Sequence, residues 1–152
     1  MKTEYGRSLI ELVGVLAIGG IMTASALGMY KMVRNNQSRH IANLILEQIA
    51  RDTKLLLSQR GDYTGVSVEY LIKSGAIKSD VAPIGGNDWS VRSSVDGKSF
   101  SINLVDLTRG ECEYFITATP TWATSVMVNG RIADPDTGCM SAPANQVSFI
   151  IE

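Results

Sequence analysis

The first third of the chain contains an uninterrupted apolar run. No charged side chain occurs from Leu12 to Tyr30, and the run consists of Leu, Val, Ile, Met and Ala diluted by glycine, serine and threonine. Nineteen residues of α-helix rise about 28 Å, close to the roughly 30 Å hydrocarbon core of a bilayer. Glycine is common where helices pack closely in membranes. The pattern predicts a transmembrane or assembly segment at about residues 12–30.

Beyond Tyr30 the apolar residues become periodic. They recur at spacings of three, four and seven, and charged residues occupy the opposite positions. The apolar positions are Ile41, Leu44, Ile45, Ile49 and Leu56. We expect Ile41, Leu44, Ile45 and Ile49 to cover the sheet. Because no proline or turn cluster intervenes, the pattern predicts one nearly continuous helix from about Ser8 to about Ser58, ended by Arg60-Gly61-Asp62 with Gly61 as its C-terminal cap.

Residues 59–152 have the pattern of a small α+β domain. A short helix is predicted over Ser67–Ser74, closed by Gly75. Four segments with β-branched or aromatic residues partly alternating with polar ones predict strands: "WSVRSSV", "SFSINLV", "TSVMVNGRIA" and "QVSFII". Tight turns are expected at Asp96-Gly97 and Asn129-Gly130, so an antiparallel sheet is the economical arrangement. The segment "GECEYFITA" fits a short helix, which we favour, and also suits a strand.

Composition narrows the possible functions. The chain has 152 residues, 45% of them hydrophobic, which suits one domain plus an anchor. Its formal net charge of -1 gives no basic field for a nucleic acid partner. With only Cys112, Cys139 and His40 as soft ligands, and no Cys-x-x-Cys spacing, we expect no metal and no cofactor. We also expect no enzymatic activity.

Ordinary secretion is one alternative reading of the N-terminus. Lys2 and Arg7 could form a positively charged region before the apolar run, with signal-peptidase cleavage after Ala26 leaving a secreted soluble domain. Two acidic residues, Glu4 and Glu11, and the lack of a helix break before Tyr30 argue against it.

Glu11 stands at the start of the apolar run. A carboxylate in hydrocarbon is unfavourable by about 2.5–3.5 kcal/mol at a helix centre and by less at an edge, so Glu11 should find a cation. Arg7 lies one helical turn away, and a neighbouring subunit could supply an amine. Between packed helices an unmatched charge is costly, whereas a matched one determines the axial register. We therefore interpret Glu11 as a charge that guides assembly.

The N-terminus resembles that of the type IV prepilins and related pseudopilins. The resemblance rests on Gly6, Ser8-Leu9-Ile10-Glu11 and the apolar run that follows. It implies a leader of residues 1–6 that prepilin peptidase removes after Gly6. Arg7 then becomes the first mature residue and the expected target of N-methylation. It also implies that residues 7–58 form the long N-terminal helix.

The rest of the chain resembles the head domain of type IVb pilins. The resemblance rests on "YTGVSVEYLIKSGAI", on "NDWSV" and on a Cys pair followed by a terminal strand. It implies a pilin fold, in which a long helix packs on a small antiparallel sheet. It further implies a disulfide between Cys112 and Cys139 that bounds a C-terminal loop.

These resemblances imply a structural subunit of an extracytoplasmic filament. The expected partners are other copies of the chain, prepilin peptidase, the inner-membrane assembly machinery and membrane lipid. The subunit would reside in a bacterial inner membrane before assembly and then in an extracellular or periplasmic filament. A pseudopilin of a type II secretion machine is the second interpretation, and the secreted soluble domain is the third. The Cys pair favours the pilin.

Overall fold

The structure is a computed structural model that describes the backbone of residues 2–118, 120–134 and 138–152. Within these ranges, the side chains of residues 2–8, 24, 27, 28, 30–33, 35 and 36 are not described. The chain divides into two compact units, Met1–Ser38 and Arg39–Glu152. The second unit is called the head below.

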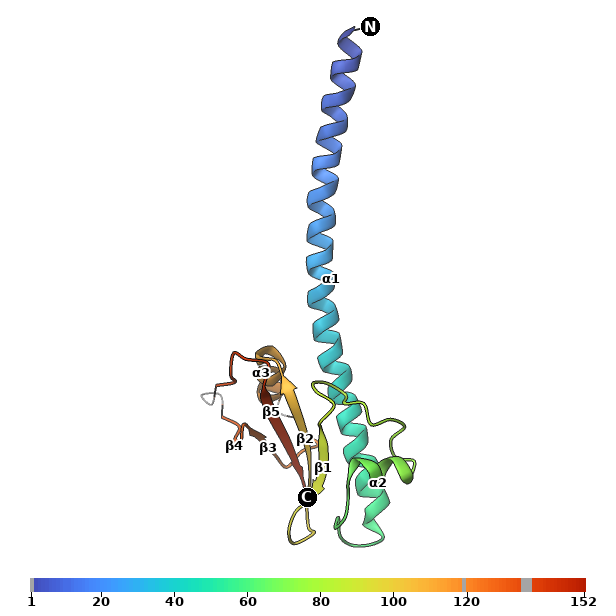
Figure 1. Ribbon diagram of the computed structural model, residues 1–152, viewed down its shortest axis with the longest axis vertical. Helices are drawn as coiled ribbons and strands as arrows, with labels where there is room; N and C mark the ends of the chain where they lie inside the picture. The colour runs from blue at the N-terminus through green and yellow to red at the C-terminus, as the bar shows by residue number, and fades with distance from the viewer. Residues whose placement is uncertain (1, 119, 135–137) are drawn as a thin grey trace. The chain divides into compact units, whose positions relative to one another are not determined.

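A single helix, α1, runs from Lys2 to Ser58 and belongs to both units (Figure 1). The prediction of one continuous helix is confirmed, although α1 begins before Ser8. At its end, the backbone N–H groups of Arg60 and Gly61 both donate to the Leu57 carbonyl, at 3.1 and 3.2 Å. Gly61 has a φ of 84°, which a residue without a Cβ adopts without strain. It therefore caps α1 as predicted.

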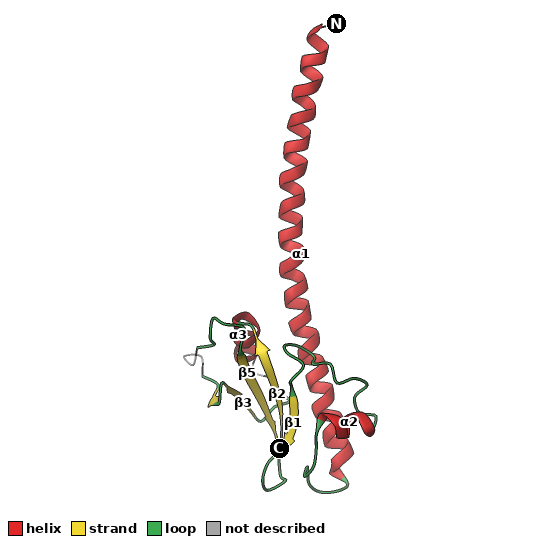
Figure 2. Cartoon of the chain, in the orientation of Figure 1, coloured by secondary structure: helices red, strands yellow, loops and turns green. Residues whose placement is uncertain are grey.

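The head combines short helices with an antiparallel sheet (Figure 2). Its elements after α1 are α2 (Val68–Lys73), β1 (Ser90–Ser93), β2 (Phe100–Leu107), α3 (Arg109–Ala118), β3 (Ser125–Val128), β4 (Arg131–Ile132) and β5 (Asn145–Ile151). Among the described residues the sheet has five strands in the order β1-β2-β5-β3-β4, and every neighbouring pair is antiparallel. The predicted α+β class and antiparallel arrangement are confirmed.

The alternation of buried and partly covered residues within the strands shows which face of the sheet is covered. Phe100, Ile102 and Leu104 of β2 are buried, whereas the residues between them are only partly covered. Ile102 pairs with Phe149 of the adjacent strand β5, which follows the same pattern. Because alternate side chains of a strand point to opposite faces, these residues build one apolar face. The helices α1 and α3 supply further residues to the same core.

The segment "GECEYFITA" is helical, as favoured. The Thr108 hydroxyl accepts a hydrogen bond from the Glu111 N–H at 3.3 Å, and the Glu111 carboxylate accepts one from the Thr108 N–H at 3.0 Å. This reciprocal arrangement is a capping box, which satisfies two otherwise free donors at a helix N-terminus. On its inner side, Phe115 packs edge-on against Phe149 with ring centroids 5.3 Å apart. The cap and this contact together favour helix over strand.

The prediction of which α1 residues cover the sheet is wrong in detail. Ile41, Leu44 and Ile45 are 49%, 51% and 40% exposed, so only Ile49 of the four residues expected to cover the sheet is buried. The buried residues of α1 in the head are Ala42, Leu46, Ile49, Ala50, Thr53 and Leu57.

The buried set also follows helical periodicity but includes small and hydroxylated residues. Ala42 and Ala50 are almost fully buried and belong to the hydrophobic core. Thr53 is fully buried because its hydroxyl donates to the Ile49 carbonyl at 2.6 Å. A prediction that weighs only large apolar residues therefore selects the neighbouring face.

Candidate assembly site

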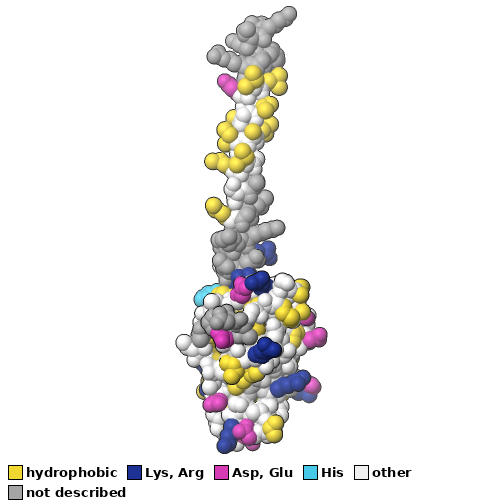
Figure 3. All heavy atoms as spheres, turned by 90° about the vertical axis from the view of Figure 1, so that its left-hand side faces the viewer, with side chains coloured by type: hydrophobic (Ala, Val, Ile, Leu, Met, Phe, Trp, Pro, Cys, Tyr) yellow, Lys and Arg dark blue, Asp and Glu magenta, His cyan; other side chains and the backbone are white. Residues whose placement is uncertain are grey.

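The first unit is a stretch of helix α1 with apolar side chains on its surface (Figure 3). The exposed fractions of its large apolar side chains between residues 9 and 22 run from 57% for Leu12 to 77% for Ile10. The full set is Leu9, Ile10, Leu12, Val13, Val15, Leu16, Ile18, Ile21 and Met22. Such a large exposed apolar surface is rare in proteins that stay monomeric in water. It indicates a surface that other apolar groups cover.

Glycines within this stretch leave its backbone open to neighbours. A Cβ added at Gly14, Gly19 or Gly20 would meet no atom within 4 Å beyond the helix itself. Small residues on a helix surface let a second helix approach closely. The glycines therefore suit helix packing between chains. Within the described part of the chain, none of the helices combines the length and the hydropathy that a bilayer crossing requires.

The residues predicted for cleavage and N-methylation, Gly6 and Arg7, and the predicted assembly charge, Glu11, all lie on α1. Glu11 is exposed, and it has no ion-pair partner among the described side chains. Gly6 and Arg7 have helical backbone but fall outside the residues whose side chains are described. Their roles in cleavage and N-methylation therefore remain predictions.

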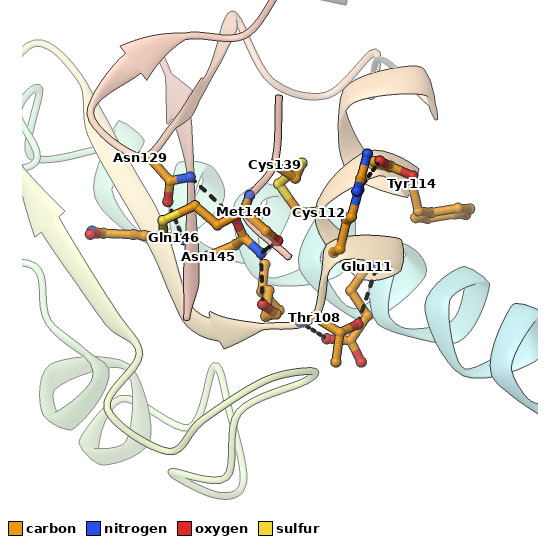
Figure 4. The surroundings of a disulfide bond; sticks show 12 residues. Thr108, Glu111, Cys112, Tyr114, Asn129, Cys139, Met140, Asn145 and Gln146 are labelled. Carbon is orange, nitrogen blue, oxygen red and sulfur yellow. Dashed lines mark hydrogen bonds and ion pairs between the residues drawn. A yellow bond between two sulfur atoms is a disulfide. The ribbon is translucent and has the colours of Figure 1, made fainter. Parts of the chain in front are cut away.

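The predicted disulfide is present in the head. Cys112 of α3 is bonded to Cys139, with Cα atoms 6.0 Å apart and 27 residues of sequence separation (Figure 4). Both cysteines are buried. The bond ties the segment before β5 to α3, which itself packs on β5 through Phe115.

The buried side-chain amide of Asn145 also binds the segment before β5. Asn145, the first residue of β5, is fully buried and donates through Nδ2 to the carbonyls of Leu107, Met140 and Ala142 at 3.1, 2.9 and 3.2 Å. Its Oδ1 accepts from the Met140 N–H at 2.7 Å and from Asn129 Nδ2 at 3.2 Å (Figure 4). One side chain thus joins β2, the loop after Cys139 and the turn after β3.

The sequence predicts the Asn129-Gly130 turn but gives no sign of the role of the Asn129 and Asn145 side chains. Asn129 has a φ of 49°, and its Oδ1 accepts from the Gln146 N–H at 2.9 Å. The tolerance of positive φ already explains an asparagine at a tight turn, so the sequence does not indicate that its side chain makes a hydrogen bond elsewhere. Asn145 offers even less signal, because its partners include Leu107 and Asn129, which lie 38 and 16 residues away in the sequence.

The other residues considered for a functional site are the potential metal ligands, His40 and Trp89. No group of acidic, histidine or cysteine residues within the described ranges could hold a metal ion. His40 is exposed on α1. Trp89 is buried, and its Nε1 donates to the Asp80 carbonyl at 2.6 Å.

Comparison with known proteins identifies the fold. No family model matches the chain, and no curated protein matches its sequence. The crystal structure of TcpA, a type IV pilin from Vibrio cholerae El Tor biotype, superimposes with a TM-score of 0.60. The match covers 76% of this chain and 99% of the TcpA chain at 15% sequence identity. The predicted pilin fold is confirmed: the chain has the fold of a type IV pilin.

Proposed function

We propose that this protein is a non-enzymatic structural subunit that assembles through its N-terminal helix into an extracytoplasmic, type IV pilus-like filament. The observation that carries the proposal is the combination of a pilin-fold head with a helix whose apolar side chains at residues 9–22 are mostly exposed. Copies of the chain would bury these side chains against one another. Removing this apolar surface from water favours association and offsets part of the translational, rotational and side-chain entropy that association costs.

Processing would prepare this helix for assembly. Cleavage after Gly6 by prepilin peptidase would remove residues 1–6 and create an α-amine on Arg7, the expected site of N-methylation. The new amine is a cation that can meet the Glu11 carboxylate of a neighbouring copy. In a dry interface, an unpaired carboxylate would be strongly unfavourable. The Glu11 charge would therefore favour one axial register over others.

The head would form the outer surface of the filament. Its disulfide and the Asn145 hydrogen bonds keep the loop around Cys139 folded against the sheet. Disulfides form and persist in oxidising environments outside the cytoplasm, so the bond between Cys112 and Cys139 suits that location.

Electron microscopy of cells with gold-labelled antibody to the head tests the proposal. Labelled filaments that disappear on deletion of the gene would support it. Short structures restricted to the periplasm would instead favour the type II secretion pseudopilin. A soluble secreted protein whose N-terminus is Leu27 would contradict both and support cleavage after Ala26.

A further inference from the structure

Asn129 and Gly130 form the two-residue turn between β3 and β4 and are the single Asn-Gly pair in the sequence. In an Asn-Gly pair, the backbone nitrogen of the glycine can attack Cγ of the asparagine, because glycine has no side chain that shields this nitrogen. Both residues are exposed, so water reaches the turn. The turn is therefore a candidate site for deamidation, a covalent change that needs no enzyme.

Deamidation of this pair would proceed in two steps. In the first step, a bond forms between the Gly130 nitrogen and Cγ of Asn129, and the bond from Cγ to Nδ2 breaks. Nδ2 leaves as ammonia with the proton of the Gly130 amide, and a five-membered succinimide ring remains. In the second step, water adds to one of the two ring carbonyls and the C–N bond at that carbonyl breaks. The product at position 129 is aspartate or isoaspartate.

The backbone of the folded turn opposes ring closure. The φ angles of Asn129 and Gly130 are 49° and 81°, and two positive values identify a type I′ turn. The flat succinimide ring instead requires the peptide plane between the two residues to turn over, as in a type II′ turn, where only the first residue has a positive φ. The pairing of Val128 with Arg131 holds the hairpin closed on both sides of the turn. Ring closure therefore requires the hairpin to open locally.

The Asn129 side chain is held by two hydrogen bonds to β5. Its Oδ1 accepts from the Gln146 N–H at 2.9 Å, and its Nδ2 donates to Asn145 Oδ1 at 3.2 Å (Figure 4). Ring closure would move Cγ onto the Gly130 nitrogen and cost both of these bonds. The side chain and the backbone thus protect the turn together.

The Asn145 amide requires a donor, and not an acceptor, from position 129. Its Nδ2 donates to three backbone carbonyls, so the amide cannot turn around without leaving all three, and its Oδ1 faces Asn129. We call these four hydrogen bonds, with the one from the Met140 N–H to Oδ1, the Asn145 network. An ionised aspartate has no N–H to donate and would present an oxygen to Asn145 Oδ1. The deamidated turn is therefore incompatible with the Asn145 network.

We propose that Asn129 is a spontaneous deamidation site that the Asn145 network protects in the folded head, and that its conversion releases the segment around Met140 from the sheet. Modification would then accumulate in chains whose turn has opened, because local opening exposes groups that the closed structure holds. Protection and release both involve the head alone, so neither depends on filament assembly.

The rate of deamidation in the full chain, kept in mild detergent at mildly alkaline pH, tests the protection. Mass spectrometry of the peptide that contains residue 129 measures the replacement of NH2 by OH, with Asn103, which precedes a leucine, as the internal reference. Asn145→Ala should deamidate at least about tenfold faster than the unmodified chain, because its turn opens more often. Val91→Ala is the control and should deamidate at the unmodified rate. Val91 is buried in β1, which β2 separates from β5, so its truncation destabilises the head without touching the network.

Equal rates in the two variants would mean that the network does not protect Asn129, and would overturn the proposal. So would deamidation of the folded, unmodified chain as fast as that of the chain unfolded in urea, a comparison that requires no variant to fold.

Hydrogen exchange of the Met140 N–H tests the release of its segment. Exchange should be at least about tenfold faster in Asn129→Asp than in the unmodified chain, since this N–H donates to the Asn145 Oδ1 that the new carboxylate would face. Gln146→Glu is the matched control, because it places the same charge on the neighbouring exposed side chain and should leave the exchange unchanged. Slow exchange in Asn129→Asp, or equally fast exchange in both variants, would refute the release.

Discussion

The Asn145 side chain binds both backbone groups of Met140, accepting from its N–H at 2.7 Å and donating to its carbonyl at 2.9 Å. Met140 directly follows Cys139, so the amide and the disulfide hold adjacent residues of one loop. Two different kinds of bond thus attach this loop to the folded head.

Replacing Asn145 with alanine should lower the free energy of unfolding by about 2–3 kcal/mol, since it removes the hydrogen bonds from a buried amide to the carbonyl of the buried Leu107 and to both backbone groups of Met140. Urea unfolding followed by tryptophan fluorescence measures the change. Gln146→Ala is the matched control, because Gln146 is the next residue of β5 and is exposed. Equal stability of the two variants would mean that water replaces the amide.

Replacing Cys112 and Cys139 together with serine should destabilise the head by roughly 3–4 kcal/mol. A cross-link over 27 residues restricts the unfolded chain by about that amount in the chain-entropy model. The same unfolding experiment measures it, with reduction of the unmodified protein as an independent comparison. Free thiols on native exported protein would contradict the presence of the bond in the cell.

Replacing Gly6 with a bulky residue should leave unprocessed precursor, because we expect the peptidase to cleave after this residue. Intact-mass analysis of the unmodified protein should give a mature chain that begins at Arg7. Methylation of the new amine would replace one hydrogen with a methyl group and so add the mass of one CH2 unit. Normal processing of the Gly6 variant would show that another peptidase acts on the chain.

Replacing Glu11 with glutamine should sharply reduce filament assembly, since the carboxylate would no longer neutralise a cation between packed helices. Sheared surface filament relative to total cellular subunit is the measurement. Glu4→Gln is the control, because Glu4 lies in the leader that cleavage would remove. Unchanged filament yield in the Glu11 variant would show that this carboxylate does not guide assembly.

Replacing Ser94 with alanine should raise the pKa of Asp96. In the native turn, the Ser94 hydroxyl and the Lys98 N–H both donate to the Asp96 carboxylate and hold its pKa below the usual value. A pKa depressed in the folded state contributes stability above the unfolded pKa, and this contribution is lost as the pH falls through the folded pKa. Carboxyl-detected NMR titration measures the shift. The pKa of Glu69, lowered by its hydrogen bond to Lys73, is the internal control and should not change.

Local signals in the sequence were sufficient to predict much of the secondary structure of this protein. The continuous helix, its glycine cap, the short helix at Ser67–Ser74 and the turn at Asn129-Gly130 each depend on neighbouring residues, so periodicity and turn chemistry predict them. The apolar stretch around Glu11 can be predicted in the same way, because its residues follow one another closely in the sequence.

Only the tertiary structure decided which side of α1 faces the sheet and which side chains hold the loop after Cys139. Ile45 and Leu46 are neighbours with similar hydrophobicity, yet Leu46 is fully buried and Ile45 is 40% exposed. Both faces of the helix carry apolar residues, and the face that is buried includes the small residues Ala42 and Ala50. The partners of Asn145 come from segments up to 38 residues away. Such contacts depend on packing between distant segments, which local sequence patterns do not encode.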